Sequence, residues 1–340
     1  MIGVSVVVLG DPAQPAHLTA AALQNLMGER LSVRAFEWSL DGAGSFADAA
    51  EQAERGYEFP VPDTWLDALG TAEVLVTHFF PIRQGVLALS PRLRVIATLR
   101  HGEENVDKDA ARARAITVIN NPGREAEAVS DFAVGLIIEQ IRGLTKSSSA
   151  LAAGEWLSPS DAAPYARNMR DVRVGIVGYG HVGRLVRKKI AGFGSSVSVC
   201  DPQVDDSTIA SDGATPVKFL ELLQWADVVT LHVRLSRSTH SLIGARELSA
   251  MQRHAYLINT ARAELIDQEA LLEALGSGTI AGAALDVFWT EPIPPGSSVM
   301  SARNLIKTPH LAGSTSDSQV ESAKLLARRL ADTLEMLATQ

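Results

Sequence analysis

The stretch VGIVGYGHVGR, residues 174–184, reads as a buried strand that turns sharply into a helix. Its glycines Gly178, Gly180 and Gly183 stand at the G-x-G-x-x-G spacing. In such a turn the first glycine permits the bend, the second lets backbone amides approach a pyrophosphate, and the third allows close helix–strand packing. The helix N-terminus adds free amides and a partial positive charge. The stretch therefore predicts a dinucleotide-binding turn.

The segments around this turn support a cofactor site. A second apolar strand, 197–200, ends in Asp201, at about the 20-residue distance expected for the acid that hydrogen-bonds the adenosine ribose. A carboxylate there favours NAD, because it would repel the 2′-phosphate of NADP. His181 and Val182, in the first turn of the helix, are also predicted to bind the cofactor.

Composition limits the classes of protein that remain. A chain of 340 residues can form two full-sized cores, and its net charge of −8 argues against nucleic acid or an anionic membrane as a partner. The opening MIGVSVVVLG lacks a basic region and is too short an apolar run for a signal peptide or membrane span, so it predicts a first strand. The single cysteine, Cys200, favours the cytoplasm. We expect no metal site.

Apolar strands alternate with helical stretches, such as 216–225 and 267–276, from residue 173 onward and more weakly over 1–120. This alternation predicts an α/β protein with two doubly wound parallel-sheet domains, a Rossmann cofactor domain and a flavodoxin-like substrate domain. A long helix is expected over 124–145, where it could also serve a dimer interface. The expected strands are 2–9, 31–36, 73–78, 93–98, 116–119, 173–178, 196–200, 226–232, 256–260, 281–287 and 304–308.

The last helix indicates how the domains are connected. Ser316 and Gln319 form a capping-box start for a helix with one apolar stripe. If that helix packs back on the first domain, the substrate domain is discontinuous. We therefore expect a substrate domain of residues 1–123 and 311–340 and a dinucleotide-binding domain of residues 124–310.

Four polar side chains follow the later predicted strands, at the edge where open α/β sheets bind ligands. Arg262 offers a planar fork for a carboxylate or a polarised carbonyl. His310 can exchange a proton with a hydroxyl near neutral pH, and a carboxylate hydrogen-bonded to it would fix its tautomer. Asp286 and Glu291 complete the set. With a nicotinamide cofactor, this set suits the oxidation of a hydroxyl beside a carboxylate.

In these segments the chain resembles the D-isomer-specific 2-hydroxyacid dehydrogenases. The resemblance is strong over residues 95–315 and weak before them. The stretches that carry it are NNPGREAEAVSDF, VGIVGYGHVGR, LINTARAELID, AGAALDVFWTEP and TPHLAGST, all in the family's order.

The resemblance implies a role for each residue of the catalytic set. Arg262 would bind the substrate carboxylate and carbonyl, His310 would be the acid/base, and Glu291 would be its partner. The backbone around His101 and Gly102 would hold the substrate carboxylate.

The resemblance also assigns cofactor contacts. Asp286 would orient the nicotinamide carboxamide, and Thr260 and His232 would line the cofactor site. Arg234 stands where the family often has proline, near the expected adenosine. It could reach a 2′-phosphate, so NADP stays open beside NAD.

The leading hypothesis is an NAD-dependent oxidoreductase that interconverts a D-2-hydroxy acid and its 2-keto acid. One alternative is phosphoglycerate dehydrogenase, with Arg100 and His101 binding the phosphate, although Glu103 and Glu104 oppose it. Another is a non-catalytic NAD(H)-sensing protein. The resemblance alone implies a homodimer.

Overall fold

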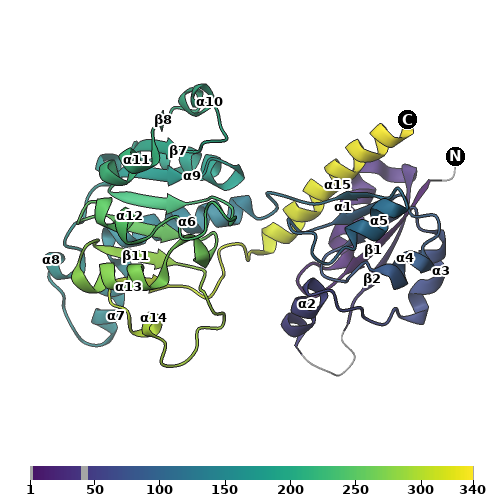
Figure 1. Cartoon of the computed structure of the whole chain (residues 1–340), viewed down its shortest axis with the longest axis horizontal. Helices are drawn as coiled ribbons and strands as arrows, with labels where there is room; N and C mark the ends of the chain where they lie inside the picture. The colour runs from purple at the N-terminus through teal and green to yellow at the C-terminus, as the bar shows by residue number, and fades with distance from the viewer. Residues whose placement is uncertain (1–2, 40–44, 340) are drawn as a thin grey trace. The chain divides into compact units, whose positions relative to one another are not determined.

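The computed structural model describes residues 3–39 and 45–339. The chain divides into two compact units, which are described separately here (Figure 1). Unit 1 comprises residues 1–125 and 315–340, and unit 2 comprises residues 126–314. The sequence pattern predicts the two boundaries between the domains slightly earlier, after residues 123 and 310, where the structure has them after residues 125 and 314.

Unit 1 is built on a five-stranded parallel sheet of order β2-β1-β3-β4-β5. Along β1, Val6 and Val8 pack in one apolar cluster and Val7 and Leu9 in another, so both faces of the sheet are covered. Burial on both faces explains why this strand is a continuous apolar run. The order confirms the predicted doubly wound sheet. The strands are β1 (Val4–Gly10), β2 (Leu31–Glu37), β3 (Val74–Thr77), β4 (Val95–Thr98) and β5 (Thr117–Ile119).

Helices cover the two faces of this sheet. Trp65 and Leu69 pack in the cluster on one face, whereas Leu23 packs with Leu326 and Leu330 on the other. The strand expected over 2–9 begins at residue 2, which lies outside the described residues. The helices of unit 1 are α1 (Ala16–Met27), α2 (Phe46–Glu54), α3 (Leu66–Thr71), α4 (Gln84–Leu89), α5 (Lys108–Ala113) and α15 (Ser316–Ala338).

The C-terminal helix α15 belongs to unit 1 and lies beside α1 (Figure 1). Its cap is Thr315, whose Oγ1 accepts a hydrogen bond from the Ser318 N–H at 3.0 Å. The predicted capping pair of Ser316 and Gln319 is wrong by one residue, because the extended Thr315 supplies the capping hydroxyl and Ser316 is already helical.

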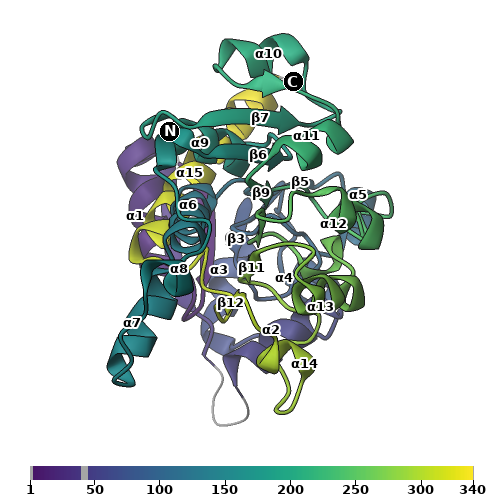
Figure 2. The same cartoon turned by 90° about the vertical axis from the view of Figure 1, so that its left-hand side faces the viewer.

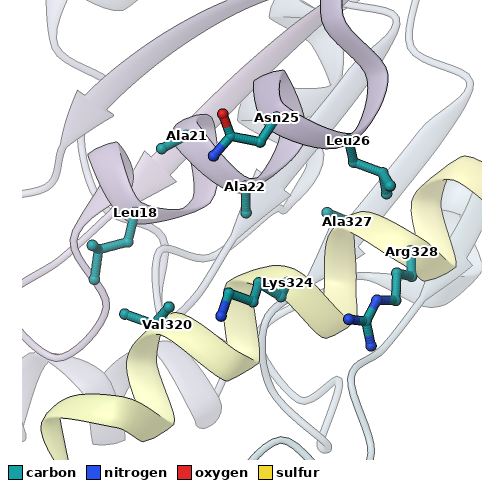
Figure 3. Close-up of a pocket in the computed structure, with 9 residues that line it drawn as sticks. All are labelled: Leu18, Ala21, Ala22, Asn25, Leu26, Val320, Lys324, Ala327 and Arg328. Atoms are coloured by element: carbon teal, nitrogen blue, oxygen red, sulfur yellow. The ribbon is translucent and has the colours of Figure 1, made fainter.

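A surface groove of about 300 Å³ lies between α1 and α15 (Figure 3). Its lining combines the small side chains of Ala22 and Ala327 with the cationic side chains of Lys324 and Arg328. Lys324 forms an ion pair with Glu321 at 2.7 Å. None of the predicted site residues lines this groove.

Unit 2 contains a seven-stranded parallel sheet of order β12-β11-β10-β9-β6-β7-β8. Strand order reverses between β6 and β9, which is the arrangement of a Rossmann sheet. Figure 2 shows β7, β6 and β9 in succession, with α10 beyond β7. The strands are β6 (Arg173–Val177), β7 (Ser196–Cys200), β8 (Thr215–Pro216), β9 (Val228–Leu231), β10 (Tyr256–Asn259), β11 (Gly282–Leu285) and β12 (Leu305–Lys307).

The long helix expected over 124–145 is shorter in the structure. It ends at Arg142, because Gly143 adopts a left-handed φ of 58° and starts a separate helix. The helices of unit 2 are α6 (Ala126–Arg142), α7 (Leu144–Ala152), α8 (Pro159–Ala162), α9 (His181–Ala191), α10 (Asp206–Ser211), α11 (Phe219–Trp225), α12 (Ala245–Ala250), α13 (Gln268–Ser277) and α14 (Ser298–Ser301).

The edge strand β8 was not expected from the sequence. The sequence pattern predicts a helix over 216–225, but that helix starts at Phe219. Thr215 and Pro216 instead pair with Ser198 and Val199 of β7. Proline is tolerated there because an edge strand has one side that makes no ladder bonds.

A buried carboxylate, Asp227, holds the amino end of the unit 2 sheet. It accepts hydrogen bonds from the Arg173 backbone N–H at 2.8 Å, from the Arg173 and Arg167 guanidinium groups, and from His254 Nε2 at 2.8 Å. Burial alone would raise the pKa of Asp227, but the hydrogen bonds from Arg173 and His254 prevail and lower it to about 2.

Replacing Asp227 with Asn should lower the free energy of unfolding at pH 7 by about 2 kcal/mol. The folded-state pKa lies below the unfolded value of about 3.9, so this contribution is complete above about pH 5 and is lost as the pH falls through about 2. Urea unfolding at several pH values measures it, with exposed Asp171→Asn as the matched control. A difference that persists unchanged at pH 2 would show that the carboxylate charge is not responsible.

Candidate active site

The predicted side chains of unit 2 all follow strands at the carboxyl edge of its sheet. The turn between β6 and α9 is shaped by its glycines: Gly178 has a φ of 94°, which L side chains rarely adopt. A Cβ on Gly183 would lie 2.1 Å from the Gly178 carbonyl oxygen, whereas one on Gly180 would meet no atom within 4 Å. The first turn of α9 is therefore open to a ligand, with His181 exposed and Val182 half-buried.

Asp201 follows β7 and is tied to the glycine turn. Its Oδ2 accepts from the Tyr179 N–H at 2.7 Å and its Oδ1 from the Gln203 N–H at 2.8 Å. The half-buried carboxylate lines a cavity of about 720 Å³ within unit 2, as does Cys200, whose thiol pKa is raised by burial and by Asp201. Arg234 is exposed and does not line this cavity. Besides Asp201, the charged residues that line the cavity are Asp206, Lys218 and Glu221.

His232 and Thr260 follow β9 and β10. His232 Nε2 lies 2.9 Å from Thr230 Oγ1, and burial lowers the pKa of His232 to about 3, so its imidazole is neutral at pH 7. Its backbone adjoins the glycine turn, since a Cβ on Gly178 would lie 2.7 Å from the His232 carbonyl carbon. The buried Thr260 Oγ1 has no hydrogen-bond partner among the described residues. Such an orphaned hydroxyl fits a polar atom of a ligand.

Asp286 follows β11 and is fully buried. Its Oδ1 accepts from Thr308 Oγ1 at 2.7 Å and from the Leu311 N–H at 2.9 Å, and its Oδ2 accepts from the Ala312 N–H at 2.8 Å. The carboxylate therefore fixes the loop that carries His310. Sequence reasoning gave Asp286 only a cofactor role and missed this one, because its partners lie more than twenty residues further along the chain.

His310 and Glu291 form the expected pair, with His310 Nδ1 at 2.7 Å from Glu291 Oε2. Glu291 is itself held by the Phe288 N–H, which donates to its Oε1 at 2.8 Å. His310 has a φ of 52°, in the left-handed region. Strained backbone of this kind concentrates at functional sites and persists only where the surroundings enforce it, as the bonds of Asp286 do here.

Arg262 is exposed, and its Nη1 donates to the Ala261 carbonyl at 2.7 Å. The turn beneath it is held by Asn259, which donates to the Arg262 carbonyl at 2.8 Å and accepts from the Ala261 N–H at 3.0 Å. Sequence reasoning missed Asn259, although a buried amide at a strand end is a signal that could have found it. Within the described residues, no hydrogen bond or ion pair joins Arg262 to His310.

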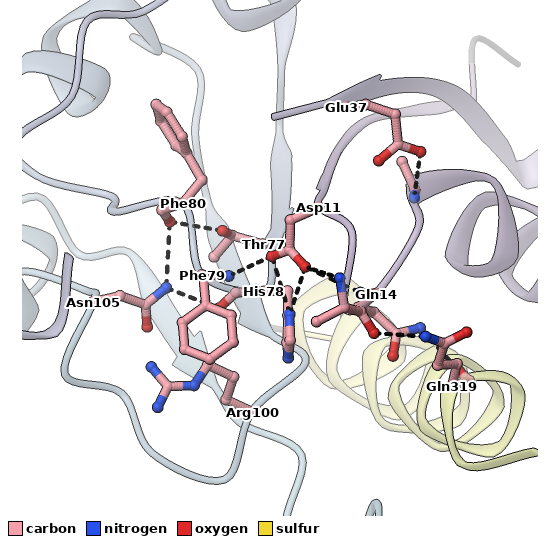
Figure 4. Close-up of polar contacts among 12 residues, drawn as sticks. Asp11, Gln14, Glu37, Thr77, His78, Phe79, Phe80, Arg100, Asn105 and Gln319 are labelled. Atoms are coloured by element: carbon pink, nitrogen blue, oxygen red, sulfur yellow. Dashed lines mark hydrogen bonds and ion pairs between the residues drawn. The ribbon is translucent and has the colours of Figure 1, made fainter. Parts of the chain in front are cut away.

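The carboxyl edge of the unit 1 sheet carries the predicted substrate loop, Arg100, His101 and Gly102, directly after β4. Arg100 is largely buried, and its Cζ lies 4.3 Å from the centre of the Phe79 ring (Figure 4). His101 is exposed, and its carbonyl accepts from Asn120 Nδ2 at 2.7 Å. The loop after β4 therefore places the Arg100 and His101 side chains at the carboxyl edge of the sheet.

A buried pair that sequence reasoning missed, Asp11 and His78, lies at the same edge, where strand order reverses between β1 and β3. His78 Nδ1 is 3.0 Å from both Asp11 carboxylate oxygens, and Asp11 also accepts from the Gln14 and Phe79 N–H groups (Figure 4). Burial lowers the pKa of His78. Its Nε2 lies 3.4 Å from Arg124 Nη1, so a neutral His78 accepts from that guanidinium.

Within residues 3–39 and 45–339, no group of three or more His, Cys, Asp or Glu side chains could hold a metal ion. Nor does any helix there have the length and apolar character needed to cross a membrane.

The fold and unit 2 together define a class of protein, the dinucleotide-dependent oxidoreductases with two doubly wound α/β units. The chain belongs to the D-isomer specific 2-hydroxyacid dehydrogenase family, because the family's NAD binding domain matches residues 134–312, more than half of the chain. It is accordingly an NAD-dependent enzyme that interconverts 2-hydroxy and 2-keto acids.

Relatives support this assignment. A glyoxylate reductase of Thermofilum pendens is 34% identical over 74% of this chain and 74% of its own length. A glycerate dehydrogenase of Methylorubrum extorquens is 34% identical over 81% of this chain and 85% of its own. The crystal structure of a glyoxylate reductase from Paecilomyes thermophila has a TM-score of 0.70 at 25% identity, covering 98% of this chain and 96% of that one.

The residues of unit 2 fit NAD. The space beside Gly180 admits a pyrophosphate, and Asp201 keeps acceptor oxygens at the wall of the 720 Å³ cavity, where an adenosine ribose would offer hydroxyls. The orphaned Thr260 hydroxyl supplies a further polar contact.

Proposed function

We propose that this enzyme reduces a small 2-keto acid with an uncharged tail, such as glyoxylate or hydroxypyruvate, to the D-2-hydroxy acid. The observation that carries this proposal is the His310–Glu291 pair at 2.7 Å, on a loop fixed by buried Asp286. An imidazole held by a carboxylate beside a nicotinamide site suits proton exchange with a hydroxyl.

His310 would move the proton. Its Nδ1 is taken up by Glu291, which leaves Nε2 to give a proton to the substrate carbonyl oxygen or take it back from the hydroxyl. Glu291 stabilises the charged imidazolium, because it is a carboxylate at hydrogen-bonding distance. When bound, NAD(H) supplies or accepts the hydride.

Arg262 would bind the substrate carboxylate and polarise its carbonyl. Its guanidinium has one backbone contact and is otherwise exposed, so most of its donors are available to a ligand. Unit 2 would then bind the cofactor through Gly178, Gly180, Gly183, His181, Val182, Asp201, His232, Thr260 and Asp286. Unit 1 would bind the substrate through Arg100, His101 and Gly102.

A cytoplasmic homodimer is part of the proposal. Helix α7 has no buried residue; Leu144 and Leu151 on it are 54% and 58% exposed, and Trp156, shortly after it, is 89% exposed. Exposed apolar groups gathered in one segment are typical of protein interfaces. The single cysteine, Cys200, supports the cytoplasm. Sedimentation velocity measures the association state.

A panel of 2-keto acids assayed with NADH and NADPH tests the function. We expect turnover of glyoxylate and hydroxypyruvate with NADH. Turnover of no acid, together with tight NADH binding, would instead support the non-catalytic sensor. A clear lead for 3-phosphohydroxypyruvate would support phosphoglycerate dehydrogenase.

Replacing Asp201 with Ser should narrow the preference for NADH over NADPH by about tenfold, since a repulsive carboxylate is removed from the expected 2′-phosphate position. Fluorescence titration of both cofactors measures the ratio. Asp205→Ser, an exposed neighbour that does not line the cavity, is the control. A natural protein that already binds NADPH better would refute this role of Asp201.

Replacing Glu291 with Gln should lower kcat/KM for keto-acid reduction, because the amide carries no charge to stabilise the imidazolium that donates the proton. Steady-state assays with hydroxypyruvate measure the effect. Activity equal to that of the natural enzyme would exclude Glu291 from the proton transfer.

A further inference from the structure

At the carboxyl edge of unit 1, Arg100 and Arg124 each have a carboxylate partner, whereas Arg83 donates to the backbone carbonyls of Glu104 and Ala53. Arg100 Nη2 bonds Glu54 Oε1 and lies 3.9 Å from Glu104 Oε2. Glu54 is the last residue of α2, and Glu104 lies four residues after Arg100 in the substrate loop. One guanidinium therefore faces two carboxylates.

The position of Arg100 is fixed as well as neutralised. Its side chain is only 15% exposed and packs on the face of Phe79 (Figure 4). This stacking and the bond to Glu54 hold the guanidinium plane from two directions. Its Nη1 is buried and has no hydrogen-bond partner among the described residues. The guanidinium is thus held in place at the edge, with its positive charge offset by neighbouring carboxylates.

The neighbouring cation is compensated in the same way. Arg124 Nη2 lies 2.5 Å from Glu125 Oε1. His78 adds no charge beside it, because burial lowers the pKa of His78 and this effect outweighs the opposing effect of the Asp11 carboxylate. With Arg83 included, the four carboxylates of Glu54, Glu104, Glu125 and Asp11 outnumber the three arginines at this edge.

We propose that Glu54 and Glu104 are specificity residues that neutralise Arg100 and thereby exclude 2-keto acids with a second anionic group. The proposal rests on the proposed function, the reduction of a small 2-keto acid. A phosphate or second carboxylate would meet two acidic side chains before it could pair with Arg100, which is a repulsive element of specificity. A hydroxyl tail carries no charge and therefore meets no such repulsion.

The test compares hydroxypyruvate with 3-phosphohydroxypyruvate, which differ only by the phosphate. In the natural enzyme, kcat/KM for the phosphorylated acid should be at least about tenfold lower. Glu54→Gln should raise the ratio of phosphorylated to unphosphorylated kcat/KM by about tenfold, which corresponds to about 1.4 kcal/mol, and Glu54→Gln with Glu104→Gln should raise it further. The gain should lie in KM for the phosphorylated acid.

Two controls separate charge from folding. Glu51→Gln changes the same helix, one turn earlier, at a carboxylate that pairs with Arg55 instead, and should leave the ratio within about twofold. Arg100→Met added to Glu54→Gln should abolish the gain, because the freed guanidinium is gone. Circular dichroism confirms that each variant is folded.

An unchanged ratio in the folded Glu54→Gln and double variants overturns the proposal. So does a natural enzyme that prefers the phosphorylated acid. If the natural enzyme turns over neither acid nor glyoxylate, the proposed function fails and this proposal fails with it, whereas turnover with an unchanged ratio refutes the specificity role alone.

Discussion

Replacing His310 with Asn should lower kcat for keto-acid reduction by ~10²–10⁴-fold, the usual contribution of a general acid, while the Kd for NADH stays within about twofold. The asparagine amide has no proton to give near neutral pH. Stopped-flow reduction and fluorescence titration of NADH measure the two quantities separately.

Asparagine is the substitution of choice because His310 has a φ of 52°. Asn tolerates the left-handed region better than other non-glycine residues, so the backbone can persist. The loop also stays anchored, since Asp286 binds the backbone of Leu311 and Ala312 rather than the imidazole. His17→Asn, which changes an exposed residue of α1, is the matched control. Retained turnover would exclude His310 as the acid, and a parallel loss of NADH binding would indicate a structural role.

The cofactor unit could be predicted from the sequence because its constraints are local. The turn itself requires Gly178, Gly180 and Gly183. Asp201 directly follows the next strand, so these residues can be recognised without knowledge of a distant partner. Continuous apolar strands likewise reveal a parallel sheet covered on both faces. What periodicity could not show was β8, a two-residue edge strand that contains Pro216.

The contacts that organise the site were beyond the sequence, because they join residues far apart in the chain. Asp286 was expected from its place after a strand, yet its hold on residues 308–312 depends on how the loop after β12 returns. Asp11 and His78 are 67 residues apart, and only the order of strands in unit 1 makes them neighbours. The rule applied to unit 2, that polar residues after parallel strands gather at one edge, would have found them.

The ion-pair partners of Glu103 and Glu104 also could not be predicted from the sequence. The sequence predicts that both acidic residues of the substrate loop would repel a phosphate, but it does not reveal which cation each of them pairs with. In the structure, Glu103 pairs with Lys108 at 3.3 Å, whereas Glu104 faces Arg100. The carboxylate that binds Arg100 most closely is Glu54, which lies 46 residues earlier and carries no sequence signal.

Replacing Arg262 should give the second large loss of activity. Arg262→Lys keeps the charge but loses the planar fork, and kcat/KM should fall by about 10²-fold; Arg262→Ala loses both and should fall by about 10³-fold or more. The fold should survive, because Asn259 holds the turn and the guanidinium has only one backbone contact. Added guanidinium ion should restore part of the activity of Arg262→Ala, which a merely structural defect would not allow. Arg246→Lys, which changes an exposed residue of α12, is the control. Activity of Arg262→Ala within tenfold of the natural enzyme would mean that another group binds the substrate carboxylate.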